Sequence, residues 1–313
     1  MGHSHDHAYM SGGHASGREA DRARLRLVLA VTVLVTVVEI VGAVVSHSLA
    51  LFADAGHMMT DAAAIVLALS ASLMATLPAS ERRTFGYHRA EILAAMVNAL
   101  VLLGVCTWLG YSGVRRLLHP THVDAGQMLL FAAVGLAANL TSIVLLAARR
   151  DSSLNMRGAY LEVLGDLLGS FFTVVAAVVI LASGFLRADS IVSLLIAVLI
   201  LPRSWSLLRE TVAVLLESAP PDVDVASVRT HLLGADGVVE VHDLHAWMIT
   251  SGMPAMSAHI TVTDAALAAR GVGVILDDLT RCVAEHFGID HATLQIEPQS
   301  HRAHENLGET DHA

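Results

Sequence analysis

The sequence predicts a membrane α-helical protein, with six transmembrane helices followed by a ferredoxin-like α+β cytoplasmic domain. Three observations predict this architecture. Of the 313 residues, 54% are hydrophobic and only 15% are charged, whereas soluble proteins carry about 25% charged residues. Long apolar runs fill the first two thirds of the chain. The acidic excess follows them, since residues 1–217 carry 15 basic and 15 acidic side chains and residues 218–313 carry 4 and 14.

Six apolar runs are each long enough to cross a bilayer, because a spanning helix needs about 20 residues. The runs cover residues 27–46, 49–77, 91–114, 125–148, 158–183 and 190–213. The predicted parts are a flexible His-containing N-terminal tail (1–24), a six-helix transmembrane domain (25–217), a cytoplasmic domain (218–298) and a flexible C-terminal tail (299–313). The two cysteines lie far apart in sequence, so no disulfide framework is expected.

Loop arginines predict the orientation of these helices, because basic residues gather on the cytoplasmic side of a membrane. One side of the six runs carries Arg18, Arg22, Arg24, Arg26, Arg82, Arg83, Arg89, Arg149, Arg150 and Arg157. The loops of the opposite side carry Arg115, Arg116 and Arg187. We therefore expect a multi-pass protein of the cytoplasmic (inner) cell membrane, in contact with lipid, with both termini in the cytoplasm.

The segment after the sixth run has the pattern of a small mixed domain. Ala219-Pro220-Pro221-Asp222 ends that run and indicates a hinge. The pattern then predicts a helix over 222–233, strands over 238–250 and 255–263, a helix over 265–287 and a strand over 292–297. Its acidic charge argues against nucleic-acid binding and for a surface that faces cations. Its small size favours help from dimerisation or bound metal.

Four ionisable side chains inside two apolar runs form the candidate metal site. His57 and Asp61 lie in the second run, and Glu162 and Asp166 lie in the fifth. Each pair is four residues apart and so shares one helix face, and the two pairs are expected at similar depth in antiparallel helices. One imidazole and three carboxylates suit Zn²⁺, and oxygen-rich ligation also admits Co²⁺ or Cd²⁺. The alternative is that each pair is a local helix-stabilising contact.

Other polar residues of the apolar runs have competing interpretations. Asp54 could guide ions on the outer side, or it could orient His57 as a hydrogen-bond acceptor. A lone Glu39 in the first run favours a structural hydrogen bond over metal ligation. Asn98 and Asn139 favour hydrogen bonds between helices.

Several segments resemble the cation diffusion facilitator family. They are SLALFADAGHMMTD (48–61), TFGYHRAE (84–91), LGDLLGS (164–170) and VHDLHAW (241–247), the last being similar to the start of the family's cytoplasmic domain. The resemblance covers about residues 20–300. It implies a homodimeric exporter, not an enzyme, that exchanges a cytoplasmic divalent metal cation for protons.

The resemblance also assigns roles to residues of the membrane part. His57, Asp61 and Asp166 match the family's transport ligands, and Glu162 stands where the fourth ligand is commonly His. This departure is similar to the bacterial cobalt–zinc–cadmium resistance branch, so Zn²⁺ with Cd²⁺ or Co²⁺ is the expected cargo. Some members have a His-containing metal site between the second and third helices, and the loop 82–87 lacks such ligands, so that site is expected to be absent.

In the cytoplasmic domain, the resemblance maps regulatory metal ligands onto His242, His259 and Glu297. Gln295 stands where some members have His, and His291 is an alternative ligand. A surface histidine without metal is the competing interpretation of His259. The family's interlock between its membrane and cytoplasmic halves maps onto Arg89 and Glu217.

The remaining histidines are weaker candidates for metal binding. His242 and His245 are three residues apart on a predicted strand, so we expect them to point to opposite faces and not to share an ion. The terminal segments are expected to capture metal weakly, through His3, His5, His7, His14, His301, His304 and His312.

Metal–proton antiport is the expected mechanism. Metal requires deprotonated ligands, so metal binding expels protons and proton rebinding expels metal, while rocking of the helix bundle exposes the site to each side in turn. Two other functional classes fit the sequence less well. An intramembrane metalloprotease needs an H-E-x-x-H motif, and the segment from His57 to Asp61 lacks that Glu. A membrane-anchored metal sensor does not explain two ionisable pairs at matching depth.

Overall fold

The computed structural model describes residues 11–75, 77–78, 80–148 and 154–300. The chain divides into two compact units. The first contains residues 1–66 and 97–206, and the second contains residues 67–96 and 207–313. Several long helices therefore begin in one unit and end in the other.

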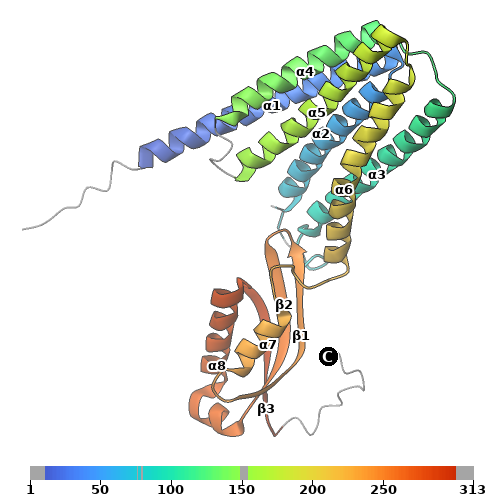
Figure 1. Ribbon diagram of the computed structural model, residues 1–313. Helices are drawn as coiled ribbons and strands as arrows, with labels where there is room; N and C mark the ends of the chain where they lie inside the picture. Colours follow the sequence, from blue (N-terminus) through green and yellow to red (C-terminus); the bar gives the residue numbers. More distant parts are fainter. Residues whose placement is uncertain (1–10, 76, 79, 149–153, 301–313) are drawn as a thin grey trace, which may run out of the picture. The chain divides into compact units, whose positions relative to one another are not determined.

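Long helices make up the membrane part (Figure 1). They are α1 (Ser11–Ser46), α2 (Leu49–Ala75), α3 (Arg89–Leu118), α4 (Ala125–Ala147), α5 (Leu154–Ser183) and α6 (Arg187–Leu215). Large apolar side chains cover the outside of the first unit: Leu34, Leu130 and Val198 are all more than 60% exposed. Such a surface is costly in water and suits contact with lipid.

Among the described residues, five segments are long and apolar enough to cross a membrane. They are Leu27–Ser46, Arg89–Leu118, Ala125–Ala147, Met156–Ser183 and Arg187–Leu215. They correspond to the first and the third to sixth predicted runs. Helix α2 has 27 residues and corresponds to the second run, but its assignment as a sixth span stays a prediction.

Helix α1 begins earlier than the apolar pattern indicates. It starts at Ser11, inside the segment 1–24 for which a flexible tail is predicted. Residues 18–26 are Arg, Glu, Ala, Asp and Leu, most of which have good helix propensity, so the helix extends beyond its apolar stretch.

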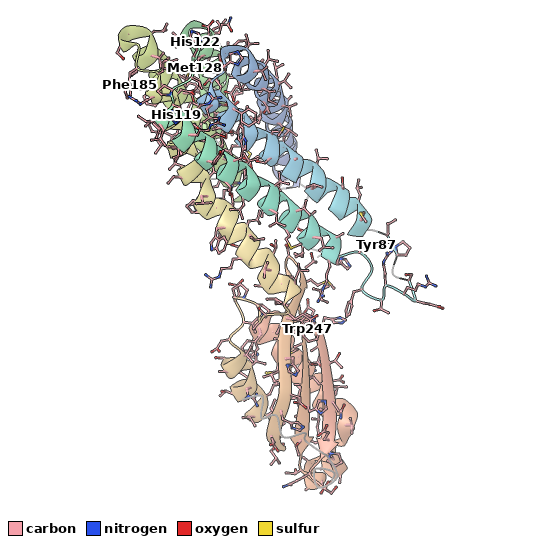
Figure 2. The ribbon with its side chains drawn as sticks, turned by 90° about the vertical axis from the view of Figure 1, so that its right-hand side faces the viewer. Tyr87, His119, His122, Met128, Phe185 and Trp247 are labelled. Atoms are coloured by element: carbon pink, nitrogen blue, oxygen red, sulfur yellow. The ribbon has the colours of Figure 1, made fainter. Side chains whose placement is uncertain are left out.

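One end of the first unit is fastened by the carboxylate of Asp189, at the start of α6. Asp189 accepts hydrogen bonds from the backbone N–H groups of Leu49 and Ala50 and from the hydroxyl of Ser48. These contacts satisfy N–H groups that a helix leaves without partners in its first turn, and so they fix where α2 begins. Figure 2 shows His119, His122, Met128 and Phe185 gathered at this end of the bundle.

The second unit contains the C-terminal domain, whose elements follow the predicted order. They are α7 (Val225–Leu233), β1 (Val238–Thr250), β2 (Met253–Val262), α8 (Asp264–Phe287) and β3 (His291–Pro298). The central strand β2 pairs with β1 in antiparallel and with β3 in parallel orientation. Buried Val228, Leu232, Ile260 and Ile275 belong to the core between the helices and one face of this sheet.

Strand β1 contains a bulge between its two histidines. His242 pairs with His259, and His245 pairs with Ser257, so a step of three residues in β1 faces a step of two in β2. Asp243 takes up the extra residue with a φ of 46°. His242 and His245 therefore lie on the same face of the sheet, and the expectation that they point to opposite faces is wrong.

Candidate metal centres

Three of the four predicted transport ligands converge inside the first unit. The ligand atoms of His57 and Asp61 from α2 and of Asp166 from α5 all lie within 4.8 Å of one another. His57 Nε2 is 3.4 Å from Asp61 Oδ2 and 3.9 Å from Asp166 Oδ1. The four-residue spacing within α2 places His57 and Asp61 on one face, and α5 supplies the third group.

These side chains are short of hydrogen-bond partners although they are largely buried. Asp166 is 4% exposed, and His57 and Asp61 are each 13% exposed at the side chain. Within the described residues, His57 Nδ1, Asp61 Oδ2 and Asp166 Oδ1 have no hydrogen-bond partner. Buried polar atoms in proteins are almost always satisfied. A cation coordinated by the two carboxylates and the imidazole would satisfy them.

Glu162 takes a more peripheral position than the other three. It lines the same cavity of about 270 Å³ as Asp61 and Asp166 and shares a hydrogen bond with Asp61. Its Oε2 atom lies 3.9 Å from Nη2 of Arg203 in α6, and its side chain is 35% exposed. The spacing of residues within one helix gives no signal for Arg203 as a neighbour of this site, because Arg203 belongs to α6.

Asp54 does not act on His57 as an acceptor. Its Oδ2 atom accepts a hydrogen bond from the hydroxyl of Ser170 at 2.9 Å, while His57 Nδ1 has no hydrogen-bond partner among the described residues. Glu39 Oε1 lies 3.5 Å from the same hydroxyl, as expected for a structural hydrogen bond. The amide of Asn139 also donates to Ser170, which confirms the expected bond between helices.

The predicted cytoplasmic ligands also come together, on the open face of the sheet. Glu297 is 4% exposed at the side chain. Its Oε1 lies 2.8 Å from His259 Nδ1, and its Oε2 lies 3.5 Å from His242 Nε2. Asp243 joins the two histidines in a group whose ligand atoms lie within 4.8 Å of one another. Only the bulge brings Asp243 there, so an ideal strand pattern gave no signal for it.

Gln295 and His291, the two alternative cytoplasmic ligands, lie at different distances from this group. Gln295 donates a hydrogen bond of 2.7 Å to Glu297 Oε1, and it therefore holds a ligand in place. His291 stands opposite Ala255 at the start of β3, four residues before Gln295, which pairs with His259. That step corresponds to about 13 Å along a strand, so His291 is too far away to replace a ligand of this group.

Arg89 and Glu217 form the ion pair that the resemblance implies. The Nη2 and Oε1 atoms of these residues are 2.9 Å apart, and both side chains are more than 40% exposed. They line a cavity of about 790 Å³ together with Phe85 and Trp247, the latter labelled in Figure 2. All of these residues belong to the second unit.

Comparisons with known proteins match both halves of the chain. Residues 25–216 match a family model described as the cation efflux transmembrane domain. Residues 220–299 match a model described as the cytoplasmic domain of cation efflux proteins. The two matches meet at the predicted hinge.

Three bacterial relatives are similar over nearly the whole chain. The metal cation efflux system protein CzcD of Cupriavidus metallidurans is 42% identical over 296 residues, which cover 95% of this chain and 90% of the relative. The zinc transporter ZitB of Escherichia coli is 38% identical, covering 96% and 93%. The cadmium, cobalt and zinc/H(+)-K(+) antiporter of Bacillus subtilis is 32% identical, covering 98% and 94%.

A solved structure is similar to part of the chain. It is the metal-bound C-terminal domain of the CzcD transporter from Cupriavidus metallidurans, 36% identical, with a TM-score of 0.22. The match covers 24% of this chain and 99% of that structure.

Proposed function

This chain belongs to the cation diffusion facilitator (cation efflux) family, and from that premise we propose that it exports divalent metal cations in exchange for protons. It is a multi-pass membrane transporter and not an enzyme. The observation that carries the proposal is the group of His57, Asp61 and Asp166. Their ligand atoms lie within 4.8 Å of one another inside the membrane part. In the part of the chain that the structure describes, His57 Nδ1, Asp61 Oδ2 and Asp166 Oδ1 have no hydrogen-bond partner.

The cargo is Zn²⁺, with Cd²⁺ and Co²⁺ as further substrates. The relatives are named for zinc, for cadmium, cobalt and zinc, or for metal cations in general. Glu162 completes the site as its fourth ligand and is its third carboxylate. An imidazole at this position would make the site more selective for Zn²⁺. To reach the metal, Glu162 exchanges its contact with Arg203 for coordination.

Proton exchange follows from the charge of the ligand set. Three carboxylates exceed the charge of a divalent cation, and they coordinate it only when deprotonated. Metal arriving from the cytoplasm therefore displaces protons, and protons arriving from the other side displace the metal. Rocking of the bundle alternates the access of the site between the two sides.

The protein works as a homodimer in the cytoplasmic (inner) membrane, with six spanning helices and both termini in the cytoplasm. The loop arginines support this orientation. The match of residues 220–299 to the cytoplasmic-domain model of cation efflux proteins supports the dimer, and we propose a ferredoxin-like fold for this domain. There, Zn²⁺ bound by His242, His259 and Glu297 would screen acidic charges of the two copies and favour one conformation.

Asp61→Asn and Asp166→Asn test the transport site. In proteoliposomes with an imposed pH gradient, each variant should lose metal-driven proton flux, because the amide neither coordinates Zn²⁺ strongly nor exchanges a proton. His119→Ala, at the far end of the bundle, is the matched control and should transport like the wild type. Normal flux in either Asp variant, with normal expression, would refute the site.

A further inference from the structure

A second group of buried polar side chains lies in the bundle and contributes no ligand to the transport site. Its members come from four helices: Glu39 of α1, Asp54 of α2, Asn139 of α4 and Ser170 of α5 (Figure 1). Each is at most 1% exposed. Ionisable side chains at membrane depth are costly and commonly mark ion or proton pathways.

A single hydroxyl connects the members of this group. Ser170 Oγ accepts a hydrogen bond of 3.1 Å from the amide of Asn139 and donates one of 2.9 Å to Asp54 Oδ2. Glu39 Oε1 lies 3.5 Å from the same oxygen. A hydroxyl has one hydrogen to donate, so it serves Asp54 well and Glu39 poorly. Glu39 Oε2 is buried and has no hydrogen-bond partner among the described residues.

Two glycines leave the space that the two carboxylates occupy. A Cβ atom at Gly135 of α4 would overlap with Glu39 Oε1, and a Cβ atom at Gly169 of α5 would lie 2.5 Å from Asp54 Oδ1. Any other residue at these positions would force a carboxylate to move. The backbone of α4 therefore lies close to Glu39, and the backbone of α5 lies close to Asp54, so the helices enclose the two carboxylates.

Two ionised carboxylates cannot stay in this apolar interior without a compensating cation, because each buried charge must be paired. The pair consists of Glu39 on α1 and Asp54 on α2. A third carboxylate, Asp166 on α5, increases the need for a compensating cation, because its negative charge acts on both members of the pair. Within the described part of α4, the contact comes from the neutral Asn139.

We propose that Glu39 and Asp54, joined by Ser170, form a proton-holding site that is separate from the metal ligands and exchanges its proton when metal binds. This inference rests on the proposed transport function. Asp54 lies three residues before His57, and Ser170 lies four residues after Asp166, so the two sites are about one helical turn apart. The hydrogen bonds of Glu39 and Asp54 go to Ser170, and none joins them to a metal ligand within the described residues.

The proposed proton exchange breaks and re-forms only carboxylic O–H bonds. The pair holds one proton while the metal site is empty. When a divalent cation binds, one proton leaves the metal ligands and one leaves the pair, each by the breaking of a carboxylic O–H bond and transfer to water. The two positive charges of the cation thus replace those of the two protons. When the cation departs, protons from water re-form these bonds. The transporter thus carries a proton at a position that never coordinates the metal.

Calorimetric titration of the full chain in nanodiscs tests this proposal. Zn²⁺ is titrated in buffers of different ionisation heat, which gives the number of protons released per bound metal. Glu39→Gln and Asp54→Asn should each release about one proton fewer than the wild type, while Zn²⁺ affinity changes by less than about threefold. Ser142→Ala removes another buried polar group, on α4, and should leave the proton count unchanged.

Infrared spectroscopy covers the case of a variant that does not fold. The metal-free wild type should show the carbonyl band of a buried carboxylic acid, and this band should vanish when Zn²⁺ is added. Ser170→Ala keeps every carboxylate and should shift the band, because Ser170 is hydrogen-bonded to Glu39 and Asp54. A band that persists, or an unchanged proton count in both variants, overturns the proposal. So does a Zn²⁺ affinity that depends on Na⁺ or K⁺ at constant pH, since the occupant would then be an alkali cation.

The outcomes also separate this proposal from the transport site itself. If Asp61→Asn binds one Zn²⁺ fewer per chain than the wild type, the transport site stands. An unchanged proton count in Glu39→Gln and Asp54→Asn would then refute the proton-holding site alone. If Asp61→Asn binds Zn²⁺ as the wild type does, the transport site fails, whatever the proton count.

Discussion

Nη2 of Arg203 in α6 lies 3.9 Å from Oε2 of Glu162 in α5, at the edge of the cavity that Asp61 and Asp166 also line. A fixed positive charge next to a metal site is unexpected, because it repels the cation. It compensates part of the negative charge of the ligands when the site is empty. Arg203 and the metal therefore compete for Glu162.

Removing this positive charge should tighten metal binding. The pair is partly exposed, with side-chain exposures of 59% and 35%, so water and salt screen it to at most about 1 kcal/mol. Arg203→Ala should therefore bind Zn²⁺ up to about fivefold more tightly, and the gain should shrink at high salt. Zn²⁺ titration at two ionic strengths measures both effects, with Arg209→Ala as the control on the same helix. A tenfold weaker affinity in Arg203→Ala would show instead that the arginine organises the site.

Glu162 should set the breadth of metal selectivity. Glu162→His gives the site a second imidazole. Zn²⁺ prefers a site with imidazole ligands to one made mostly of oxygen ligands. Competition of Zn²⁺, Cd²⁺ and Co²⁺ for uptake into proteoliposomes should show selectivity shifted towards Zn²⁺ relative to the wild type. Glu162→Gln keeps an oxygen ligand and is the control for charge alone. Unchanged Cd²⁺ and Co²⁺ uptake in the His variant would contradict this role.

Glu297 should carry most of the stabilisation that Zn²⁺ gives to the cytoplasmic domain. It contacts both His242 and His259. At a Zn²⁺ concentration about 100 times the dissociation constant, bound metal adds about 2.7 kcal/mol, or roughly 10–20 °C in the melting temperature of a small domain.

Thermal unfolding of the full chain checks this, in an Asp61→Asn background that silences the transport site. Glu297→Gln should lose the Zn²⁺-dependent rise in melting temperature, and His291→Ala should keep it. Retention of the rise in Glu297→Gln would exclude this group as the regulatory site.

Asp224 should make the stability of the cytoplasmic domain depend on pH. Its side chain caps α7, and the Ser227 hydroxyl, followed by the Ala226 N–H, lowers the pKa of this carboxyl below its ordinary value of 3.8. The ionised form is favoured in the folded state, so its stabilisation is full above that value and is lost as the pH falls through the lowered pKa.

Asp224→Ala should therefore melt at a lower temperature than the wild type near pH 7, and the difference should shrink as the pH falls through the lowered pKa of Asp224. Asp224→Asn keeps a capping side chain that does not titrate, and so it is the matched control. Melting curves followed by circular dichroism across this pH range give the comparison. A difference that stays constant with pH would contradict the assignment.

Much of the fold follows from patterns that the sequence states directly. Apolar runs predicted the long helices, and alternation with turn residues predicted the α-β-β-α-β order of the C-terminal domain. The four-residue spacing of His57 and Asp61 predicted their shared face, and the structure brings Asp166 to them. These features depend on periodicity, which is local information.

Features that depend on irregularity or on tertiary contacts were not predictable. The bulge at Asp243 reverses the expected faces of His242 and His245, and one extra residue leaves no trace in an alternating pattern. Arg203 reaches Glu162 from a different helix, and spacing along one helix cannot show this. The bond of Asp54 to Ser170 likewise depends on where α2 and α5 meet.

Because Asp189 anchors the first turn of α2, this turn is the expected pivot of any tilt of the helix. Its first turn is tied to the start of α6, so a tilt must pivot there, and displacement grows with distance from Leu49. His57 and Asp61 lie about 12 and 18 Å along the arm from that pivot. A tilt about this anchor would therefore displace Asp61 about half again as far as His57, and we expect the contact of a bound ion with Asp61 to lengthen first.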